Sequence, residues 1–229
     1  MAIKRETSSF PPNQEEICMK IAVIGATGKA GRLIVQEAVA RGHEVTAVAR
    51  SAGASSEPGA KVLRKDLFAL TYEDVKENDV IIDAFGVWAP EALEQHQTSL
   101  KHLADMLGGK PNRLLVVGGA GSLYVDPAHT LRVMDAPDFP EMFKPLARNM
   151  ARAFDALRAR TDIRWTYLSP AANFVADGPR TGAYTAGDEE IMVNSKGESH
   201  ISYADYAVAM IDEAENGKHM NARFTVVSE

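Results

Sequence analysis

The sequence predicts a doubly wound α/β fold, in which a mainly parallel sheet carries helices on both faces. Short apolar runs alternate with longer amphipathic segments from Met19 onward. This alternation is typical of parallel strands connected by crossover helices. The first apolar run leads directly into the glycine-spaced turn GATGKAG at residues 25–31 and then into a helix. Because such sheets bind ligands at the carboxyl ends of their strands, we expect functional residues directly after the strands.

Size and composition fit one globular domain. The chain has 229 residues, a formal net charge of −6 and a hydrophobic content of 45%. We expect a single domain over residues 19–229 and a flexible N-terminal extension over the polar residues 1–18. The acidic balance predicts no nucleic-acid partner, and no apolar run reaches the ~18 residues that span a membrane. We therefore expect a cytoplasmic protein. The single cysteine, Cys18, excludes an intrachain disulfide, and no metal site is predicted.

Elements in the first half of the chain follow from short apolar runs and helix boundary residues. The run KIAVI at 20–24 is too short for a helix and fits a buried strand. A helix is expected at 28–40, where apolar residues recur at helical spacing and Gly42 follows as a stop. Further strands are predicted at 44–48, 61–64 and 80–84, with a short helix at 71–77. Thr71 can cap that helix, because Asp74 lies three residues on.

The second half continues the alternation and then departs from it. A helix at 90–107 would begin with proline and end before two glycines, and a strand at 113–117 precedes the sequence GGAG. A long helix is expected at 142–160 and a sixth strand at 164–168. Residues 171–200 are expected to form turns and a short hairpin, which would make a small C-terminal substrate region. The last elements are predicted at 203–215 (helix) and 224–227 (strand).

The turn at residues 25–31 is predicted to bind the phosphates of a dinucleotide in a Rossmann domain. Gly25 permits a tight turn, Gly28 lets the backbone approach a pyrophosphate, and Gly31 lets the helix pack close to the strand. The amide groups and dipole at the helix start favour an anion. The residues assigned to this site are Gly25, Thr27, Gly28, Lys29 and Ala30. The alternative is a glycine-rich turn that binds no ligand.

Residues after the next strands predict the type of cofactor. Arg50 ends the second strand, where an acidic residue would hold the ribose 2′-hydroxyl of NAD and an arginine suits the 2′-phosphate of NADP. We therefore expect NADP to be preferred and NAD to be possible, unless Arg50 is only a solvated surface residue. The contacts to adenine and ribose are assigned to Asp66, Leu67, Ala84, Phe85 and Gly86. The alternatives at these positions are a helix cap and a plain glycine turn.

Several segments together resemble the atypical short-chain dehydrogenase/reductase group. They are GATGKAG, the strand end at Arg50, KDLF around Asp66, DAFG around Gly86, VVGGAGSLYVDP and WTYLSPAANF. From Met19 to about Val227 the sequence is similar to the NADH–flavin reductase family, relatives of the flavin/biliverdin reductases and of NmrA-like proteins.

The resemblance implies which residues face the nicotinamide. In that family the segment matching residues 119–122 borders the nicotinamide, and the segment with Pro170, Ala171 and Asn173 lies against its carboxamide. Ser122 takes roughly the place of the dehydrogenase serine, and Tyr124 is a candidate stand-in acid, so both are assigned as catalytic. The alternative for Ser122 is a loop hydroxyl that bonds its own backbone.

The sequence departs from ordinary short-chain dehydrogenases in one respect. Those enzymes use Tyr-x-x-x-Lys on the helix after the fifth strand, and the predicted helix at 142–160 contains no tyrosine. Reduction of a ketone creates an alkoxide, which needs a positioned proton donor. Hydride transfer to a flavin or quinone gives a delocalised anion that solvent can protonate, so proximity and orientation suffice. The missing pair therefore disfavours an alcohol dehydrogenase.

Other polar residues are weaker candidates. His96 and His102 lie six apart on one predicted helix, do not share a face as metal ligands would, and are expected to be solvated. His129 is a candidate proton shuttle, and Trp88 either stacks on a planar substrate or belongs to an interface or the core. Glu189-Glu190 is expected to be a solvated turn.

Two functions fit these observations. The first is an NAD(P)H-dependent oxidoreductase that transfers hydride from NADPH to a flavin or quinone-like acceptor. In this case the flavin is a substrate and not a prosthetic group, and the partner is a small planar molecule. The second is an NmrA-like sensor that binds NADP and regulates a partner without turnover. The sequence leaves the oligomeric state open.

Overall fold

The computed structural model describes residues 18–50 and 57–229. The N-terminal extension predicted for residues 1–18 therefore lies outside the described residues, apart from Cys18. The thiol of Cys18 is exposed and lies 3.4 Å from the carbonyl oxygen of Gly42, at the end of the first helix.

The strands and helices follow the predicted order. The strands are β1 (Lys20–Ile24), β2 (Glu44–Ala49), β3 (Ala60–Arg64), β4 (Val80–Asp83), β5 (Arg113–Val117), β6 (Arg164–Ser169), β7 (Asn173–Val175), β8 (Tyr184–Gly187), β9 (His200–Ser202) and β10 (Ala222–Ser228). The α-helices are α1 (Lys29–Ala40), α2 (Tyr72–Val75), α3 (Gln95–Leu107), α4 (Lys144–Arg158) and α5 (Tyr203–Asn216). Short 3-10 turns are η1 (Leu67–Ala69), η2 (Pro90–Ala92), η3 (Ala120–Ser122), η4 (Val133–Asp135) and η5 (Glu141–Phe143).

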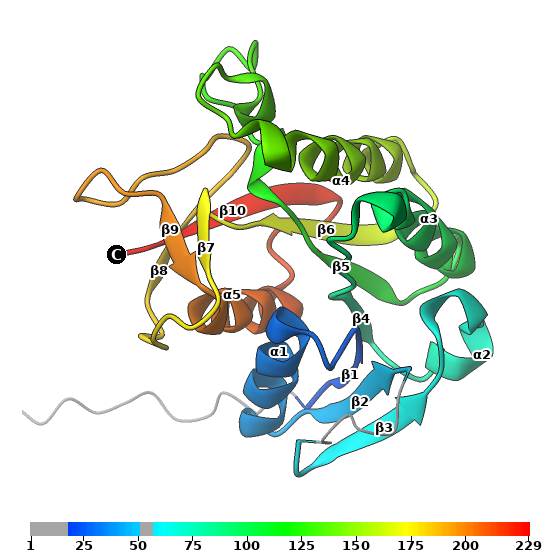
Figure 1. The fold of residues 1–229 in the computed structure, drawn as a ribbon. Coiled ribbons are helices and arrows are strands. Elements are labelled where there is room, and N and C mark those ends of the chain that lie inside the picture. The colour runs from blue at the N-terminus through cyan, green and yellow to red at the C-terminus, as the bar shows by residue number, and fades with distance from the viewer. Residues whose placement is uncertain (1–17, 51–56) are drawn as a thin grey trace, which may run out of the picture.

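Eight strands form one sheet in the order β3-β2-β1-β4-β5-β6-β10-β8, and every neighbouring pair is parallel except β10 with β8. Helices α1 and α5 pack together on one face, and α3 and α4 pack together on the other (Figure 1). Each face has its own buried apolar cluster, and the central strands contribute to both clusters. The predicted doubly wound α/β fold is confirmed. Its strand order reverses between β1 and β4, the point where such sheets bind their ligands.

The predicted hairpin within residues 171–200 is wrong. Strand β7 pairs in parallel with β9, and β8 joins the main sheet antiparallel to β10. A parallel pair needs a long connection, and residues 176–199 between β7 and β9 supply it. Because the partner of β8 is about 40 residues away in sequence, no local pattern marked the pairing.

Two predicted helices begin later than their sequence pattern indicates. Pro90 starts the single turn η2, and the regular helix α3 begins only at Gln95. Likewise, η5 precedes α4, which begins at Lys144 with proline in its first turn. The predicted capping of α2 is confirmed, because the side chain of Asp74 accepts from the amide of Thr71 at 2.7 Å and both halves of the capping box are present.

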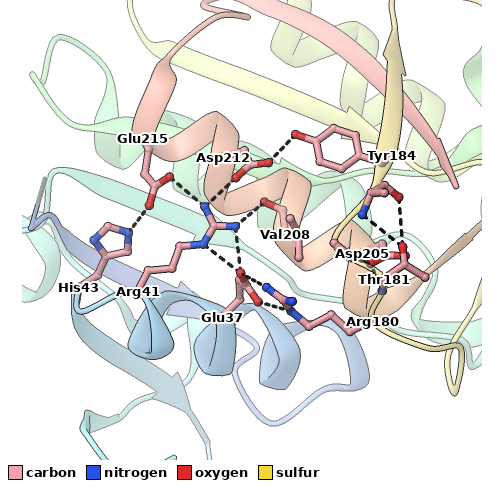
Figure 2. Close-up of polar contacts among 12 residues, drawn as sticks. Glu37, Arg41, His43, Arg180, Thr181, Tyr184, Asp205, Val208, Asp212 and Glu215 are labelled. Carbon is pink, nitrogen blue, oxygen red and sulfur yellow. Dashed lines mark hydrogen bonds and ion pairs between the residues drawn. The ribbon is translucent and has the colours of Figure 1, made fainter. Parts of the chain in front are cut away.

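A polar network joins α1 to α5 and to the segment 176–183 (Figure 2). Arg41 donates to Glu37 of its own helix at 2.9 Å and to Asp212 and Glu215 of α5 at 2.6 and 2.9 Å. Arg180, which follows β7, donates through two nitrogens to the Glu37 carboxylate, both at 2.9 Å. Burial raises the pKa of Glu37, but the hydrogen bonds from Arg180 and Arg41 outweigh it, so the pKa lies below its ordinary value.

We predict that Glu37→Gln lowers the free energy of unfolding by about 1–3 kcal/mol at pH 7, because two guanidinium groups lose a buried acceptor charge. Urea unfolding measures this difference. The folded pKa of Glu37 is lowered, so its contribution is present above the unfolded pKa of about 4.3 and is lost as the pH falls below it. The difference from wild type should therefore shrink at pH 3.

Glu73→Gln is the matched control. Glu73 pairs with Lys76 on the surface of α2, where the carboxylate side chain is 74% exposed. Such a pair is worth less than about 1 kcal/mol. Equal effects of the two substitutions would contradict the structural role assigned to Glu37.

Candidate cofactor-binding site

The glycines between β1 and α1 are required by close backbone contacts. Gly25 has a φ of +74°, and a Cβ there would lie 2.6 Å from the carbonyl oxygen of Ala84. A Cβ on Gly31 would lie 2.2 Å from the carbonyl oxygen of Gly25. A side chain at position 25 would collide with the segment after β4, and one at position 31 would push α1 away from the turn that follows β1. These contacts explain the sequence GATGKAG in physical terms.

The start of α1 is open toward a ligand. Gly28 is the N-cap residue and has no side chain with which to accept the first amides of the helix. The amides of Lys29, Ala30 and Gly31 therefore keep their hydrogen-bonding capacity for a group outside the helix. Amides arranged in this way, with the helix dipole behind them, form an anion site.

A pocket of about 380 Å³ opens in front of this turn. It lies at the carboxyl ends of β1, β2, β3 and β4, where the strand order reverses. Its lining residues are Ile24, Gly25, Thr27, Gly28, Val48, Ala49, Arg50, Lys65, Asp66, Leu67, Phe68, Ala84, Phe85, Gly86 and Gln95. The glycine turn, the missing Cβ atoms and the free amides of α1 fit a dinucleotide whose pyrophosphate lies at the helix start.

The pocket brings together nine of the predicted cofactor residues: Gly25, Thr27, Gly28, Arg50, Asp66, Leu67, Ala84, Phe85 and Gly86. Lys29 and Ala30 lie just behind it in the first turn of α1. The side chain of Asp66 accepts from the amide of Phe68 at 2.9 Å and thereby caps η1. Its second carboxylate oxygen is the part that remains for a ligand.

Six lining residues were not assigned to the cofactor from the sequence, and three of them, Lys65, Phe68 and Gln95, have polar or aromatic side chains. Lys65 directly follows β3, and Gln95 is the first residue of α3. The side chain of Phe68 is 44% exposed. Lys65 and Phe68 flank Asp66-Leu67 in KDLF, so their position after a strand was the available signal. Gln95 follows a break between η2 and α3 that the sequence pattern did not reveal.

Asp83 is a buried carboxyl group beside the pocket. It is the last residue of β4, is 5% exposed, and accepts from the amide of Phe85 at 3.0 Å. Burial raises its pKa to about 7, and the Phe85 hydrogen bond opposes this only in part. Burial therefore favours the uncharged form of this carboxyl, which lies next to the turn Ala84-Phe85-Gly86.

The two residues assigned as catalytic lie away from this pocket. The hydroxyl of Ser122 is buried and accepts from Arg223 of β10 at 2.9 Å. Arg223 also pairs with the carboxylate of Glu189, and its guanidinium lies 4.7 Å from the centre of the Phe154 ring. The expectation that Glu189 is a solvated turn residue is wrong, because a buried arginine in a distant strand requires a countercharge.

Tyr124 belongs to a small surface cluster. Its ring stacks on that of His129 with centroids 4.4 Å apart, and His129 has a φ of +55°, which is uncommon for a residue with a side chain. The Nε2 atom of His129 lies 2.7 Å from the carboxylate of Glu190. The catalytic assignments of Ser122 and Tyr124 remain predictions, and neither residue lines the pocket.

The segment assigned to the carboxamide follows β6. Pro170 and Ala171 are buried, and Asn173 begins β7 and donates its amide to the carbonyl of Ser199 at 2.9 Å. The hydroxyl of Tyr206 of α5 donates to Leu168 at 2.6 Å and fixes the end of β6 just before this segment. None of the three assigned residues lines the pocket, so their role also remains a prediction.

His96 of α3 is buried, contrary to expectation, and His102 is half-buried. His96 is 9% exposed and its Nε2 lies 3.0 Å from the carbonyl oxygen of Val87, while the Nε2 of His102 lies 3.1 Å from that of Leu70. Burial lowers the pKa of His96. Both rings satisfy loop carbonyls that helical spacing alone does not reveal. Trp88 is 70% exposed and thus outside the core.

Within residues 18–50 and 57–229, no group of three or more histidine, cysteine or acidic side chains is placed to hold a metal ion. In the same part of the chain, no helix has both the length and the apolar composition needed to cross a membrane.

The chain belongs to the NAD(P)H-binding family, whose model matches residues 25–215. The uncharacterized protein YwnB of Bacillus subtilis is 50% identical over 212 residues, which are 92% of this chain and 99% of YwnB. A crystal structure from Streptococcus pneumoniae, described as a putative NADH-flavin reductase, is 47% identical with a TM-score of 0.89, covering 92% of this chain and 100% of that one. The family resemblance inferred from the sequence is confirmed.

A more distant structure extends the likeness in fold only. ChuY, an anaerobillin reductase from Escherichia coli O157:H7, is 21% identical with a TM-score of 0.64, covering 91% of this chain and 97% of that one. The fold is thus compatible with large changes in sequence.

We predict that Asp83→Asn flattens the pH dependence of stability. The folded pKa of about 7 lies above the unfolded value of about 3.9. The folded state therefore holds an extra proton between these values, and the free energy of unfolding falls as the pH rises through that window. Asparagine keeps the acceptor for Phe85 but does not ionise. At pH 8 the variant should be more stable than wild type by at least about 1 kcal/mol.

Chemical unfolding at pH 5 and pH 8 measures this effect. Asp138→Asn, which changes an exposed aspartate, is the control and should leave the wild-type profile unchanged. Parallel profiles for wild type and Asp83→Asn would contradict the assignment of a buried, readily protonated carboxyl at the end of β4.

Proposed function

We propose that this protein is an NAD(P)H-dependent reductase that transfers hydride from NADPH to a flavin or quinone-like acceptor, which enters as a substrate. The observation that carries the proposal is the pocket itself. It combines a glycine turn, the open start of α1 and Arg50 at the end of β2. The Streptococcus pneumoniae relative is described as an NADH-flavin reductase, which supports a flavin as the acceptor.

Several residues of the pocket have a binding or orienting role in this proposal. The amides at the start of α1 hold the pyrophosphate, and Gly25 and Gly28 let the backbone approach it. Arg50 binds the 2′-phosphate with its planar guanidinium. Ala84 to Gly86 form the wall beside the ribose. When bound, the nicotinamide supplies the hydride chemistry, and the chain supplies proximity and orientation.

The composition of α4 supports the choice of acceptor. Residues Lys144–Arg158 contain no tyrosine, so the helix that carries Tyr-x-x-x-Lys in ordinary short-chain dehydrogenases has no such donor here. A ketone would leave an alkoxide without a positioned acid. Hydride transfer to a flavin or quinone gives a delocalised anion, which takes a proton from solvent to complete the reduction. A small planar acceptor is therefore the substrate class that these residues support.

A second function is favoured by the position of Ser122. Its hydroxyl is buried against Arg223 and thus has a structural partner. An NmrA-like sensor needs only a preformed dinucleotide site. Binding of NADP at that site, without turnover, would regulate a partner. An assay of NADPH turnover distinguishes the reductase from the sensor.

We predict that the purified protein oxidises NADPH when FMN, FAD, riboflavin or a small quinone is offered, and that NADH is used less efficiently. Loss of absorbance of the reduced nicotinamide measures turnover with each acceptor, and protein that has been heat-inactivated is the blank. Tight NADPH binding without turnover on any acceptor would overturn the reductase and favour the sensor.

We predict that Arg50→Ala weakens NADPH binding by about ten- to a hundredfold, as expected for the loss of a hydrogen-bonded charge. NADH binding should change by less than about twofold, because NADH has no 2′-phosphate. Titration calorimetry with both nucleotides measures the two effects. The control is Arg64→Ala, since Arg64 is an exposed arginine of β3 that does not line the pocket. Equal losses for NADPH and NADH would show that Arg50 does not bind the 2′-phosphate.

A further inference from the structure

A second cation lies beside Arg50 at the mouth of the pocket. Ala49 at the end of β2 and Arg64 at the end of β3 are register partners in the parallel pair. Arg50 and Lys65 are therefore the next residues along two adjacent strands. The amide of Lys65 donates to the carbonyl of Ala49 at 3.1 Å and holds the two chains together at this point. Both residues line the pocket.

The Lys65 side chain is held in place by Asp74 of α2. Its ammonium donates to the carboxylate of Asp74 at 2.6 Å, and the two side chains are 30% and 20% exposed. The same carboxylate accepts from the amide and the hydroxyl of Thr71, at 2.7 and 2.8 Å. The hydrogen bond from Lys65 is the main reason that the pKa of Asp74 falls to about 2. The Asp74 carboxylate is thus charged at neutral pH, and its hydrogen bonds with Thr71 hold it in place.

This arrangement leaves Lys65 able to bind an anion. A lysine ammonium has three donors, and Asp74 takes one of them. Asp74 already serves as the cap of α2, so it restrains the position of the lysine as well as balancing its charge. Restraint of a long side chain before binding reduces the entropy that binding would otherwise cost. A dianionic phosphate attracts two cations more strongly than one.

We propose that Lys65 is a second ligand of the NADP 2′-phosphate and, with Arg50, determines the preference for NADP over NAD. The inference rests on the proposed use of NADPH. In it, Arg50 approaches the phosphate from the end of β2 and Lys65 approaches from the end of β3. Asp66, the next residue, uses one carboxylate oxygen to cap η1, and the two cations beside it are the groups that can bind the 2′-phosphate.

The test compares the two adenosine halves of the cofactors, so it is independent of turnover. We measure the Kd of 2′,5′-ADP and of 5′-AMP for the full chain by titration calorimetry. Lys65→Gln should weaken binding of 2′,5′-ADP about tenfold, a loss typical of one charged hydrogen bond. Binding of 5′-AMP should change by less than about twofold, because it has no 2′-phosphate. Lys65→Arg should retain most of the affinity for 2′,5′-ADP.

Lys61→Gln is the matched control. Lys61 also lies on β3, but its side chain is 80% exposed and faces Glu44 at 3.7 Å, away from the pocket lining. It should leave both affinities unchanged. Thermal unfolding of each variant confirms that the protein is folded at the temperature of the titration. Lys65→Arg provides a second measurement if Lys65→Gln does not fold.

The outcomes separate this inference from the proposed function. A wild-type protein that prefers 2′,5′-ADP, with the preference retained in Lys65→Gln, overturns the role of Lys65 and leaves the NADPH proposal intact. Equal weakening of both ligands in Lys65→Gln, or loss of the preference in Lys65→Arg despite its charge and correct folding, also overturns it. A wild-type protein without any preference for 2′,5′-ADP overturns the NADPH preference and the role of Lys65 together.

Discussion

The arrangement of this molecule depends on the close approach of α1 to the carbonyl group of Gly25. The approach is possible only because Gly31 has no side chain, since a Cβ would lie 2.2 Å from that oxygen. It places the free amides of α1 in front of the ends of β1 and β4, where the pocket opens. The opposite end of the helix carries Arg41, which joins it to α5 (Figure 2). The two ends of α1 thus contribute to the phosphate site and to the attachment of α5, respectively.

The two halves of the candidate site, after β1 to β4 and after β5 and β6, differ in how completely the structure forms a ligand pocket. The residues after β1 to β4 line one pocket and already have the backbone geometry that a dinucleotide requires. The residues after β5 and β6 are instead engaged with other parts of the protein, as in the bond between Ser122 and Arg223. The adenosine end therefore has a defined lining of side chains. The end proposed for the nicotinamide consists of loops that are bonded to β10, α5 and the segment 188–191.

The sequence predicted those features that are encoded locally. The strand, glycine turn and helix at the N-terminus are adjacent, so spacing alone identified Gly25, Gly28 and Arg50 as lining residues. The partner of Arg223 was missed, because Glu189 lies 34 residues away and its burial depends on how the sheet edge is completed. The buried state of His96 was missed for a similar reason, since a loop carbonyl, and not the helix pattern, determines it. Local sequence patterns predicted the strands and helices. Contacts between residues distant in the sequence determine which polar side chains are solvated, and these patterns did not predict them.

The antiparallel strand β8 has a consequence beyond the site. Strand β10 has seven residues, six of them buried, and without β8 one of its sides would present a row of unpaired amide and carbonyl groups. A long apolar strand with a free side is a template for intermolecular pairing and aggregation. The outermost strands are instead β8, which has only four residues, and β3, which carries Lys61 and Arg64. Short length at one edge and positive charge at the other disfavour edge-to-edge pairing of the sheet with further copies.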